Sequence, residues 1–496
     1  MGRYNLHKKI MDLNILKVLI DSDKNRKETA WMLYYFWQND VENIKTYLEK
    51  YGQAGGMFTA ATMKVLPKLH RDITNKVLNN LCTVYVPGVD RYLVDKNGDV
   101  NEEQTELLNS IYEKAGIQDA QRDWYKAGKL FNCVEVKVVW RNVSNQAEFD
   151  LWTPDSFTVW ENAENKYLKD VIIFNVLKLD ENLSEIEALE VWTPKEHYYM
   201  VQNGTFNDGG VEKPKMERRD FDKNNPDGKN KYGIIPSEVL RFKKGEDYYG
   251  IGMIDLVEEN IWSDLVRSNF VYVQIFQGMG IVYAINMGKS GDVPLTPNKM
   301  LCVNDVKADM EMPSIEALST QAPLSEMNEI IKDNDINILT AKGLSGQTGS
   351  ADNRNSPALS KALDLEELEI MRKEDKATLE SFEERLFKTL RTVHNKNASE
   401  KLDENLEFVC NIYDRKPSYS VTDMIQKWRF EINEIGVKSP VDYLIEQDPT
   451  MTTQEAESII DEIKNYKIEK ETITDNPDPN DGQGNSRSEP EPDTAE

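Results

Sequence analysis

The sequence predicts an α+β fold, in which helices and mostly antiparallel strands occupy separate stretches of the chain. Apolar residues alternate with polar ones in runs such as NCVEVKVVW (132–140), which indicates strands. After Pro357, apolar residues recur at spacings of three and four, which indicates a long helix. The length of 496 residues is enough for about three packed units.

The first predicted helices lie between residues 26 and 85. The stretch 26–51 alternates aromatic runs with charged turns, and 67–85 is also helical in pattern. The aromatic run from Trp31 to Trp37 could form a surface on which a ligand stacks. We favour core or subunit packing instead, because aromatic side chains concentrate in cores and obligate interfaces. The first residues lack the apolar core and cleavage site of a signal peptide, so we expect a protein that is not secreted.

A module of helices and strands is expected over residues 95–245. It should contain a helix near 102–115 and, after it, a strand that ends at Trp140. Further strands are predicted, punctuated by Pro, Gly and Asn, at 148–154, 155–161, 169–179, 185–194 and 197–205. The segment 207–233 is rich in charged residues, Gly and Asn, and predicts a polar loop.

Two helices flanking a small β module are predicted next. The first spans 253–276 and keeps one side apolar, while its charged residues lie largely elsewhere. The apolar side is formed by Ile254, Val257, Ile261, Leu265 and Phe270, and the charged residues are Asp255, Glu258, Glu259, Asp264 and Arg267. Short strands and Pro-rich turns follow, and a helix ending at Lys342 returns from them. The apolar stretch 269–285 is too short and too polar for a membrane span, so we expect none.

The stretch AKGLSGQTGSADNRNSPALSKAL (341–363) has the glycines and small polar residues of a phosphate-binding loop. A Walker-type loop needs a Lys directly after its glycines and a buried strand before them. No such Lys follows Gly343, Gly346 and Gly349, and no such strand is predicted before them. The dinucleotide-binding pattern fails as well, because no βαβ unit surrounds the glycines. We therefore expect a loop without a bound nucleotide.

A long helix is predicted from Pro357 to about His394, with Pro357 in its first turn. Its apolar residues at spacings of three and four are Leu379, Phe382, Leu386, Leu390 and Val393. The helices that follow are broken at Gly436, Pro440 and Pro449, with starts predicted at SPVD (439–442) and TTQE (452–455). The last residues, from Glu471, are acidic and rich in Pro and Gly, so we expect disorder there.

Catalytic and metal chemistry is not indicated anywhere in the sequence. The four histidines are dispersed and form no HExxH motif, and the four cysteines contain no CxxC pair. No carboxylate pair stands out from the 86 Asp and Glu residues. We expect no enzyme activity, no cofactor and no metal. The net charge of −26 also argues against a protein that grips nucleic acid by neutralising phosphates.

The order of the predicted elements resembles that of portal proteins of tailed bacteriophages, of the siphophage type. The stretches that carry the resemblance run from about Arg26 to Tyr466. They are AWMLYYFWQNDVENIK, NKVLNNLCTVYVPG, YGIIPSEVLRFKKGEDYYGIGMIDLVEENIWSDLVRSNF, GLSGQTGSADNRNSPALSKALDLEELE and IGVKSPVDYLIEQDPTMTTQEAESIIDEIK. The resemblance implies a portal fold with an α/β wing, two stem helices, a small β-containing clip, a long tunnel helix and a helical crown.

The resemblance also implies a division of the chain. It implies N-terminal helices and the wing at 1–252, a stem helix at 253–277, the clip at 278–322, the returning stem helix at 323–342, the tunnel loop at 343–357, the long tunnel helix and wing return at 358–419, the crown at 420–468 and a disordered acidic tail at 469–496. The loop residues expected near DNA are Lys342, Gly343, Gly346, Gly349, Asn353 and Arg354. The clip residues expected to contact terminase and later the adaptor are Lys289, Pro294, Pro297, Lys299 and Asp305.

The function implied by the resemblance is a ring channel at one vertex of the capsid, usually of twelve subunits, through which double-stranded DNA is packaged and ejected. The implied partners are other copies of the chain, DNA bound without sequence preference, the terminase large subunit, the major capsid and scaffold proteins and the head-tail adaptor. The implied location is the virion, with assembly in the host cytoplasm.

Charge is consistent with such a channel. A ring of about a dozen chains would carry roughly 300 excess negative charges, which repel phosphates and let DNA slide. Lys342 and Arg354 could make transient phosphate contacts, or they could be solvated surface charges. Another oligomeric virion or scaffold component without a channel is the alternative, and a nucleotide hydrolase that uses the same loop ranks third.

Overall fold

A computed structural model describes most of the chain. The described residues are 23–56, 58–179, 185–208, 211–219, 227–279, 281–285, 301–303, 314–318, 323–344, 358–414, 429, 432, 439–447 and 452–474. The chain divides into two compact units, Met1–Arg415 and Lys416–Glu496. The fold is α+β, as the sequence predicts, with helices and mainly antiparallel sheets in the first unit.

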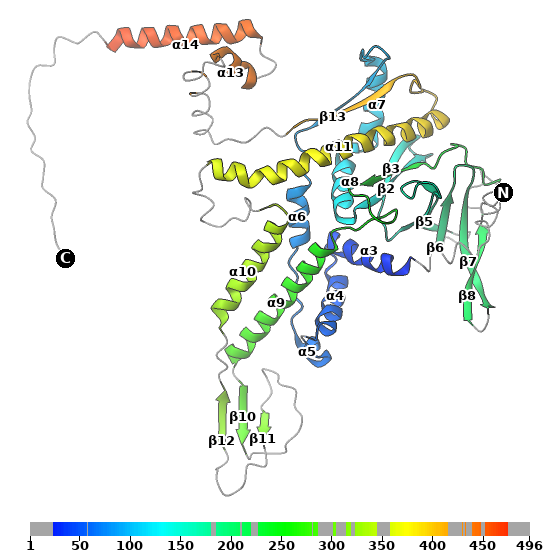
Figure 1. Cartoon of the computed structure of the whole chain (residues 1–496), viewed down its shortest axis with the longest axis vertical. Helices are drawn as coiled ribbons and strands as arrows, with labels where there is room; N and C mark the ends of the chain where they lie inside the picture. The colour runs from blue at the N-terminus through cyan, green and yellow to red at the C-terminus, as the bar shows by residue number, and fades with distance from the viewer. Residues whose placement is uncertain are drawn as a thin grey trace, which may run out of the picture. The chain divides into compact units, whose positions relative to one another are not determined.

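Four helices open the described chain (Figure 1). They are α3 (Lys24–Trp37), α4 (Val41–Ala54), α5 (Ala60–Val65) and α6 (Ile73–Leu81). The predicted helical stretch 26–51 is split at Asn39, whose φ of 52° ends α3, and Asp40 caps α4 by accepting the backbone N–H of Asn43. The expected core packing of the aromatic run holds for Phe36, which is fully buried, while Trp31 stays 40% exposed.

The next elements build the first part of the α+β module. β1 (Val89–Val94) is followed by α7 (Glu102–Lys114) and α8 (Ile117–Phe131), which Gly116 separates in a left-handed conformation with φ of 66°. The sequence analysis predicted the first of these helices and missed α8. β1 pairs antiparallel with β13 (Glu407–Ile412), which the sequence analysis also missed. The two strands are more than 300 residues apart, so no local pattern announces their pairing.

Two sheets complete the module. One has the order β3–β2–β9 and the other has the order β4–β5–β6–β7–β8, with neighbours antiparallel in both. The strands are β2 (Cys133–Arg141), β3 (Gln146–Trp152), β4 (Phe157–Glu161), β5 (Lys169–Leu179), β6 (Glu185–Trp192), β7 (His197–Asp208), β8 (Val211–Arg219) and β9 (Ser237–Arg241). The prediction of a polar loop over 207–233 is wrong at β8. This strand lies at the sheet edge and exposes most of its described side chains, so it lacks the alternation of a half-buried strand.

A pair of helices and a small sheet follow in the chain. α9 (Ile254–Met279) precedes β10 (Ile281–Ile285), β11 (Leu301–Val303) and β12 (Ser314–Leu318), and α10 (Leu324–Ala341) comes after them. β10 is the central strand of the small sheet, parallel to β11 and antiparallel to β12. α9 and α10 run side by side in opposite directions (Figure 1). The predicted apolar side of α9 is confirmed at Val257, Ile261 and Leu265, which are fully buried.

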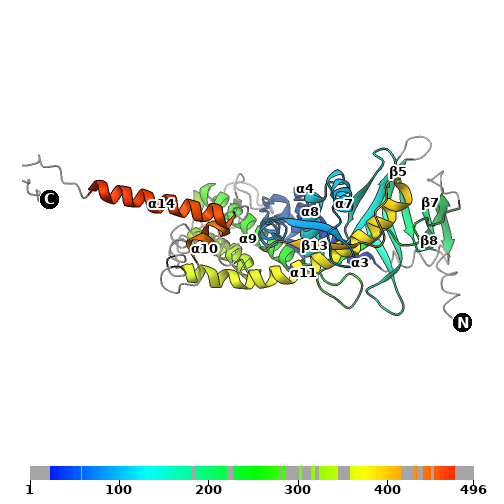
Figure 2. The ribbon, with the colours of Figure 1, turned by 90° about the horizontal axis from the view of Figure 1, so that it is seen from above.

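The long helix α11 (Ala358–Asn397) crosses the α+β module (Figure 2). It packs against β2, β9 and β13, and its predicted apolar stripe is buried in the main core cluster. The members of that stripe are Leu379, Phe382, Leu386, Leu390 and Val393, each no more than 1% exposed. In the described part of the chain no helix is long and apolar enough to cross a membrane.

The second unit contains α13 (Pro440–Gln447) and α14 (Thr453–Thr474). Both helices start where the sequence predicts. Ser439 and Asp442 exchange side-chain and backbone hydrogen bonds at the first start, and Thr452 and Glu455 do so at the second, which are capping boxes. The predicted disordered tail is wrong for residues 469–474, which belong to α14. Residues 475–496 lie outside the described part.

Candidate functional site

Residues 342–344, at the start of the predicted loop, belong to the described part of the chain. Gly343 adopts a left-handed conformation with φ of 72°, its N–H donates to the carbonyl of Thr340 at 2.9 Å, and the N–H of Leu344 donates to that of Leu339 at 3.0 Å. These two bonds form a Schellman motif, in which glycine is favoured because it has no Cβ to clash. Leu344 is 1% exposed, so the chain leaves α10 in a fixed direction.

Lys342 is neither a free cation nor a solvated one in this structure. Its side chain is only 13% exposed and forms an ion pair with Asp255 at the start of α9. Burial raises the pKa of Asp255, but the hydrogen bond and charge of Lys342 outweigh it and hold that pKa below its usual value. A phosphate contact by Lys342 would require this pair to open.

A row of polar side chains on α9 forms hydrogen bonds with the segment that connects α5 to α6 and with the first turn of α6. Asn260, Asp264 and Ser268 are spaced four residues apart and are all fully buried. Asn260 accepts the N–H and hydroxyl of Thr74, and the hydroxyl of Ser268 accepts the N–H of Leu69 at 3.0 Å. The row thus satisfies backbone groups of a segment that has no regular structure of its own.

Asp264 is the centre of this row. It accepts the backbone N–H of Arg71 at 3.0 Å and lies 2.6 Å from Nδ1 of His70, whose own side chain is buried. Burial raises the pKa of Asp264, although the contact with His70 opposes the shift. The sequence analysis placed Asp264 largely off the apolar side of the helix and did not predict that it would be buried against a polar partner.

A second pair of α9 side chains faces α10. Ser263 and Arg267 both donate to the carboxylate of Asp335, Ser263 at 3.1 Å and Arg267 at 3.1 and 3.2 Å. The guanidinium of Arg71 forms an ion pair with the same carboxylate. Arg71 therefore attaches the segment before α6 to two helices: its backbone N–H donates to Asp264 of α9, and its guanidinium pairs with Asp335 of α10. We call this arrangement around Asp264 and Asp335 the polar joint.

The sequence analysis missed the polar joint. A signal was present, because Asn260, Asp264 and Ser268 recur every four residues, which places them on one face of the helix. Their partners at 69–74 could not be predicted from the sequence, and neither could the pairing of Ser263 and Arg267 with Asp335, because these residues come from distant parts of the chain.

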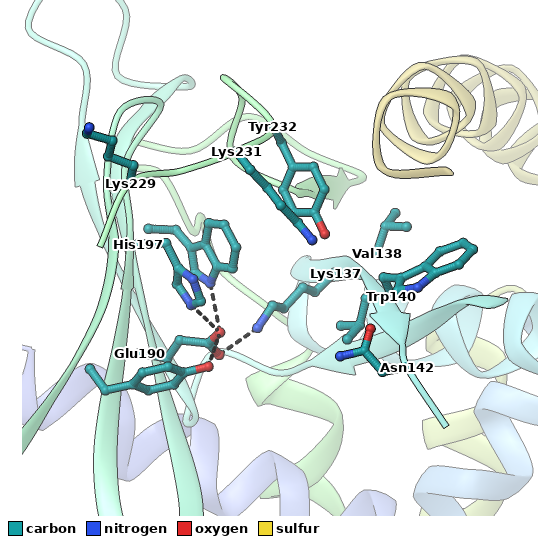
Figure 3. Close-up of a pocket in the computed structure, with 12 residues that line it drawn as sticks. Lys137, Val138, Trp140, Asn142, Glu190, His197, Lys229, Lys231 and Tyr232 are labelled. Atoms are coloured by element: carbon teal, nitrogen blue, oxygen red, sulfur yellow. Dashed lines mark hydrogen bonds and ion pairs between the residues drawn. The ribbon is translucent and has the colours of Figure 1, made fainter. Parts of the chain in front are cut away.

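A pocket of about 250 Å³ lies between the sheet β3–β2–β9 and the sheet β4–β5–β6–β7–β8 (Figure 3). Its lining includes Trp140 of β2, Trp192 of β6 and Tyr232, and at its floor lies the carboxylate of Glu190. Glu190 is fully engaged. It accepts hydrogen bonds from Lys137 at 2.5 Å, from the ring nitrogens of Trp192 and His197 at 3.0 Å, and from the hydroxyl of Tyr199 at 3.1 Å.

The pKa of Glu190 follows from these contacts. Burial alone would raise it, but the charge of Lys137 and the hydrogen bonds from His197 and Lys137 hold it well below its usual value. A carboxylate in this state is a poor general base, because it binds a proton only under strong acid.

Three cysteine thiols are buried. Burial raises the pKa of the thiols of Cys82, Cys133 and Cys410, which keeps them protonated. Within the described ranges, no group of three or more His, Cys, Asp or Glu residues could hold a metal ion.

Most of the residues predicted to face DNA or partners lie outside the described part of the chain. For the loop these are Gly346, Gly349, Asn353 and Arg354, and for the clip they are Lys289, Pro294, Pro297, Lys299 and Asp305. Only Lys342 and Gly343 of the predicted sites are described, and they meet at the C-terminal end of α10.

No protein-family model matches the chain, and no curated protein matches it. Among solved structures, the chain is similar to one in the "Virion of native gene transfer agent (GTA) particle", with 11% sequence identity and a TM-score of 0.36. The similarity covers 75% of this chain and 88% of that chain. At this score it does not establish a shared fold.

Proposed function

We propose that the chain is the subunit of a phage portal, a ring channel at the capsid vertex through which double-stranded DNA enters and leaves. The single observation that carries the proposal is the run of elements from α9 to α11. Along the chain, two helices that run antiparallel flank the three strands of a small sheet. A glycine-rich segment then leads into a 40-residue helix. This is the order that the sequence resemblance to portal proteins implies.

The polar joint supports this role. It attaches α10 to α9 mainly by charged and polar contacts, since the buried described residues of α10 are few: Ile331, Ile338 and Leu339. A channel wall that must hold its shape while DNA passes gains from such directional contacts, which fix one register of the two helices.

Charge supports the sliding of DNA. The chain carries −26, and the cation at the foot of the loop, Lys342, is paired with Asp255. The sequence from 343 to 357 contains one further cation, Arg354, so contacts of the loop to DNA would be weak and independent of sequence. ATP hydrolysis would belong to the terminase, and the head-tail adaptor would bind later. The chain would act in the virion after assembly in the host cytoplasm.

Negative-stain images of the purified chain test the ring. We expect closed rings with a central channel, because each subunit would present the same two complementary faces to its neighbours. Monomers that persist even with scaffold protein present would contradict the proposal.

Deletion of residues 346–353 tests the channel itself. If the loop meets DNA, the deletion should abolish packaging while rings still form. Rings with unaffected packaging would favour another virion or scaffold component without a channel.

A further inference from the structure

The pocket above Glu190 has the walls of a ligand site. Three aromatic side chains line it: Trp140 of β2, Trp192 of β6 and Tyr232. The ring planes of Trp192 and Tyr232 differ by 22°, and their centroids lie 6.2 Å apart. Sites for small molecules are concave, with apolar and aromatic walls and a few polar groups that fix the ligand's orientation. These walls favour a ligand whose body is apolar and planar.

The floor of the pocket does not favour a cation. Glu190 already accepts four hydrogen bonds, and Lys137 balances its charge at a distance of 2.5 Å. Both side chains of this ion pair are no more than 7% exposed. A positively charged ligand would therefore find no unpaired carboxylate at the floor.

The rim of the pocket is positive. Apart from His197, the charged residues among the described lining are three lysines and one carboxylate: Lys137, Lys229, Lys231 and Glu190. The chain as a whole has the opposite balance, with 86 acidic and 60 basic residues. Charges farther away than about 8 Å are largely screened at physiological salt, so the local balance decides which ligand the pocket attracts.

Lys231 is the cation best placed to bind an anion. Figure 3 shows its side chain beside Tyr232, among the residues that line the pocket. Its Nζ donates to Oδ1 of Asn397 at 2.7 Å and lies 5.2 Å from the centroid of the Tyr232 ring. Neither partner is charged, and an ammonium has three N–H donors, so Lys231 can also donate to an anionic ligand.

The segment 228–232, which carries this cation, is held to the turn between β6 and β7. The side-chain amide of Asn230 donates to the carbonyls of Thr193 and Ile234, each at 2.7 Å. The backbone N–H of Asn230 donates to the carbonyl of Lys195 at 2.9 Å. These bonds form the pocket in advance, so a ligand does not have to order its wall, which favours binding.

The aromatic walls and the positive rim together define a class of ligand. We propose that this pocket binds a small planar organic anion, with its ring among the aromatic side chains and its anionic group at Lys231. A volume of about 250 Å³ lies below the roughly 300–1,000 Å³ of sites for drug-sized molecules, so a ligand of one or two rings fits. The proposal does not depend on whether the chain forms a channel.

Equilibrium dialysis of the full chain against 2-naphthoate tests the proposal. We expect saturable binding of one molecule per chain, with a Kd on the order of 0.1–1 mM for a ligand of about 13 non-hydrogen atoms. The uncharged 2-naphthamide has the same rings and should bind at least about tenfold more weakly, because it cannot form a charged contact with Lys231. Absence of saturable naphthoate binding, or equal binding of the two probes, would overturn the proposal.

Lys231→Met tests the cation, because it removes the charge and keeps an unbranched side chain at this exposed position. The Kd for 2-naphthoate should rise at least about fivefold, while that for 2-naphthamide should stay unchanged. Lys215→Met is the matched control, since Lys215 is an exposed lysine of β8 that is not among the lining residues, and it should leave both values unchanged. A naphthoate Kd that is unchanged in Lys231→Met, or raised equally in both variants, would contradict the assignment.

Photolabelling of the wild-type chain locates the site without any substitution. The photoreactive anion 4-benzoylbenzoate, which has two rings, should label residues within 137–142 or 229–232 on irradiation, as mapped by mass spectrometry. Excess 2-naphthoate should suppress this labelling. Labelling confined to other parts of the chain, or labelling of these segments that naphthoate does not suppress, would show that the anion does not bind in the pocket.

Discussion

Buried charges are paired at the scale of single residues. Glu190 accepts from Lys137, and Glu383 of α11 accepts from Arg91 and from the hydroxyl of Tyr85, with every one of these side chains nearly excluded from water. Removing one partner from such a pair leaves an unpaired charge in the interior, which is strongly destabilising.

Glu190→Gln tests this pairing and its pH dependence. At neutral pH the substitution should lower the free energy of unfolding by about 3 kcal/mol, because Lys137 loses its buried counter-charge. The pKa of Glu190 in the folded chain lies below its ordinary value of 4.5, so the unfolded chain binds the proton first as the pH falls. The contribution of the Glu190 carboxylate to the free energy of unfolding is therefore complete above pH 4.5 and is lost progressively below it.

Urea unfolding at several pH values measures the effect. The gap between wild type and Glu190→Gln should narrow by about 1.4 kcal/mol for each pH unit below 4.5. Glu187→Gln, at an exposed position on the same strand, is the matched control and should change stability by no more than about 0.5 kcal/mol. A gap that stays constant down to pH 3 would contradict the assignment.

At the scale of elements, the contacts between α9 and α10 hold the two helices together. α10 buries three apolar residues, Ile331, Ile338 and Leu339, and joins α9 through the polar joint, in which Asp335 accepts from Ser263, Arg267 and Arg71. Hydrogen bonds to charged groups contribute about 1.5–3 kcal/mol each when well formed, so the joint is a large part of what holds α10 in place.

Asp335→Ala should therefore loosen α10. We expect amide hydrogen exchange in α10 to rise by at least about tenfold, because the helix opens more easily once its charged anchor is gone. Asp333→Ala is the control on the same helix, since Asp333 is exposed and should leave exchange unchanged. Equal exchange rates for both variants would show that the buried apolar residues of α10 hold the helix without Asp335.

Net charge governs the chain's behaviour toward DNA at the scale of the whole molecule. With −26 per chain, a short DNA duplex should not be retained by the purified protein in a gel-shift assay at physiological salt. A weak, non-specific complex should appear only when the salt concentration is lowered. A tight complex that weakens steeply with added salt would indicate a phosphate-gripping surface and would contradict sliding.

The sequence by itself determined the local elements. The spacing of Leu379, Phe382 and Leu386 fixed the packed face of α11, and Ser439 and Thr452 marked the starts of α13 and α14. These features depend on neighbours within a few residues, so local patterns suffice to predict them. The end of α10 just before Gly343 follows for the same reason.

Tertiary structure alone decided which distant groups meet. It paired β1 with β13, buried Asp264 against His70, gathered four donors around Glu190 and gave Lys342 its partner Asp255. It also formed β8 from a polar sequence, at a sheet edge where most of the described side chains of the strand are exposed. Each of these contacts joins residues that local patterns treat independently, and only the folded chain brings them within hydrogen-bonding distance.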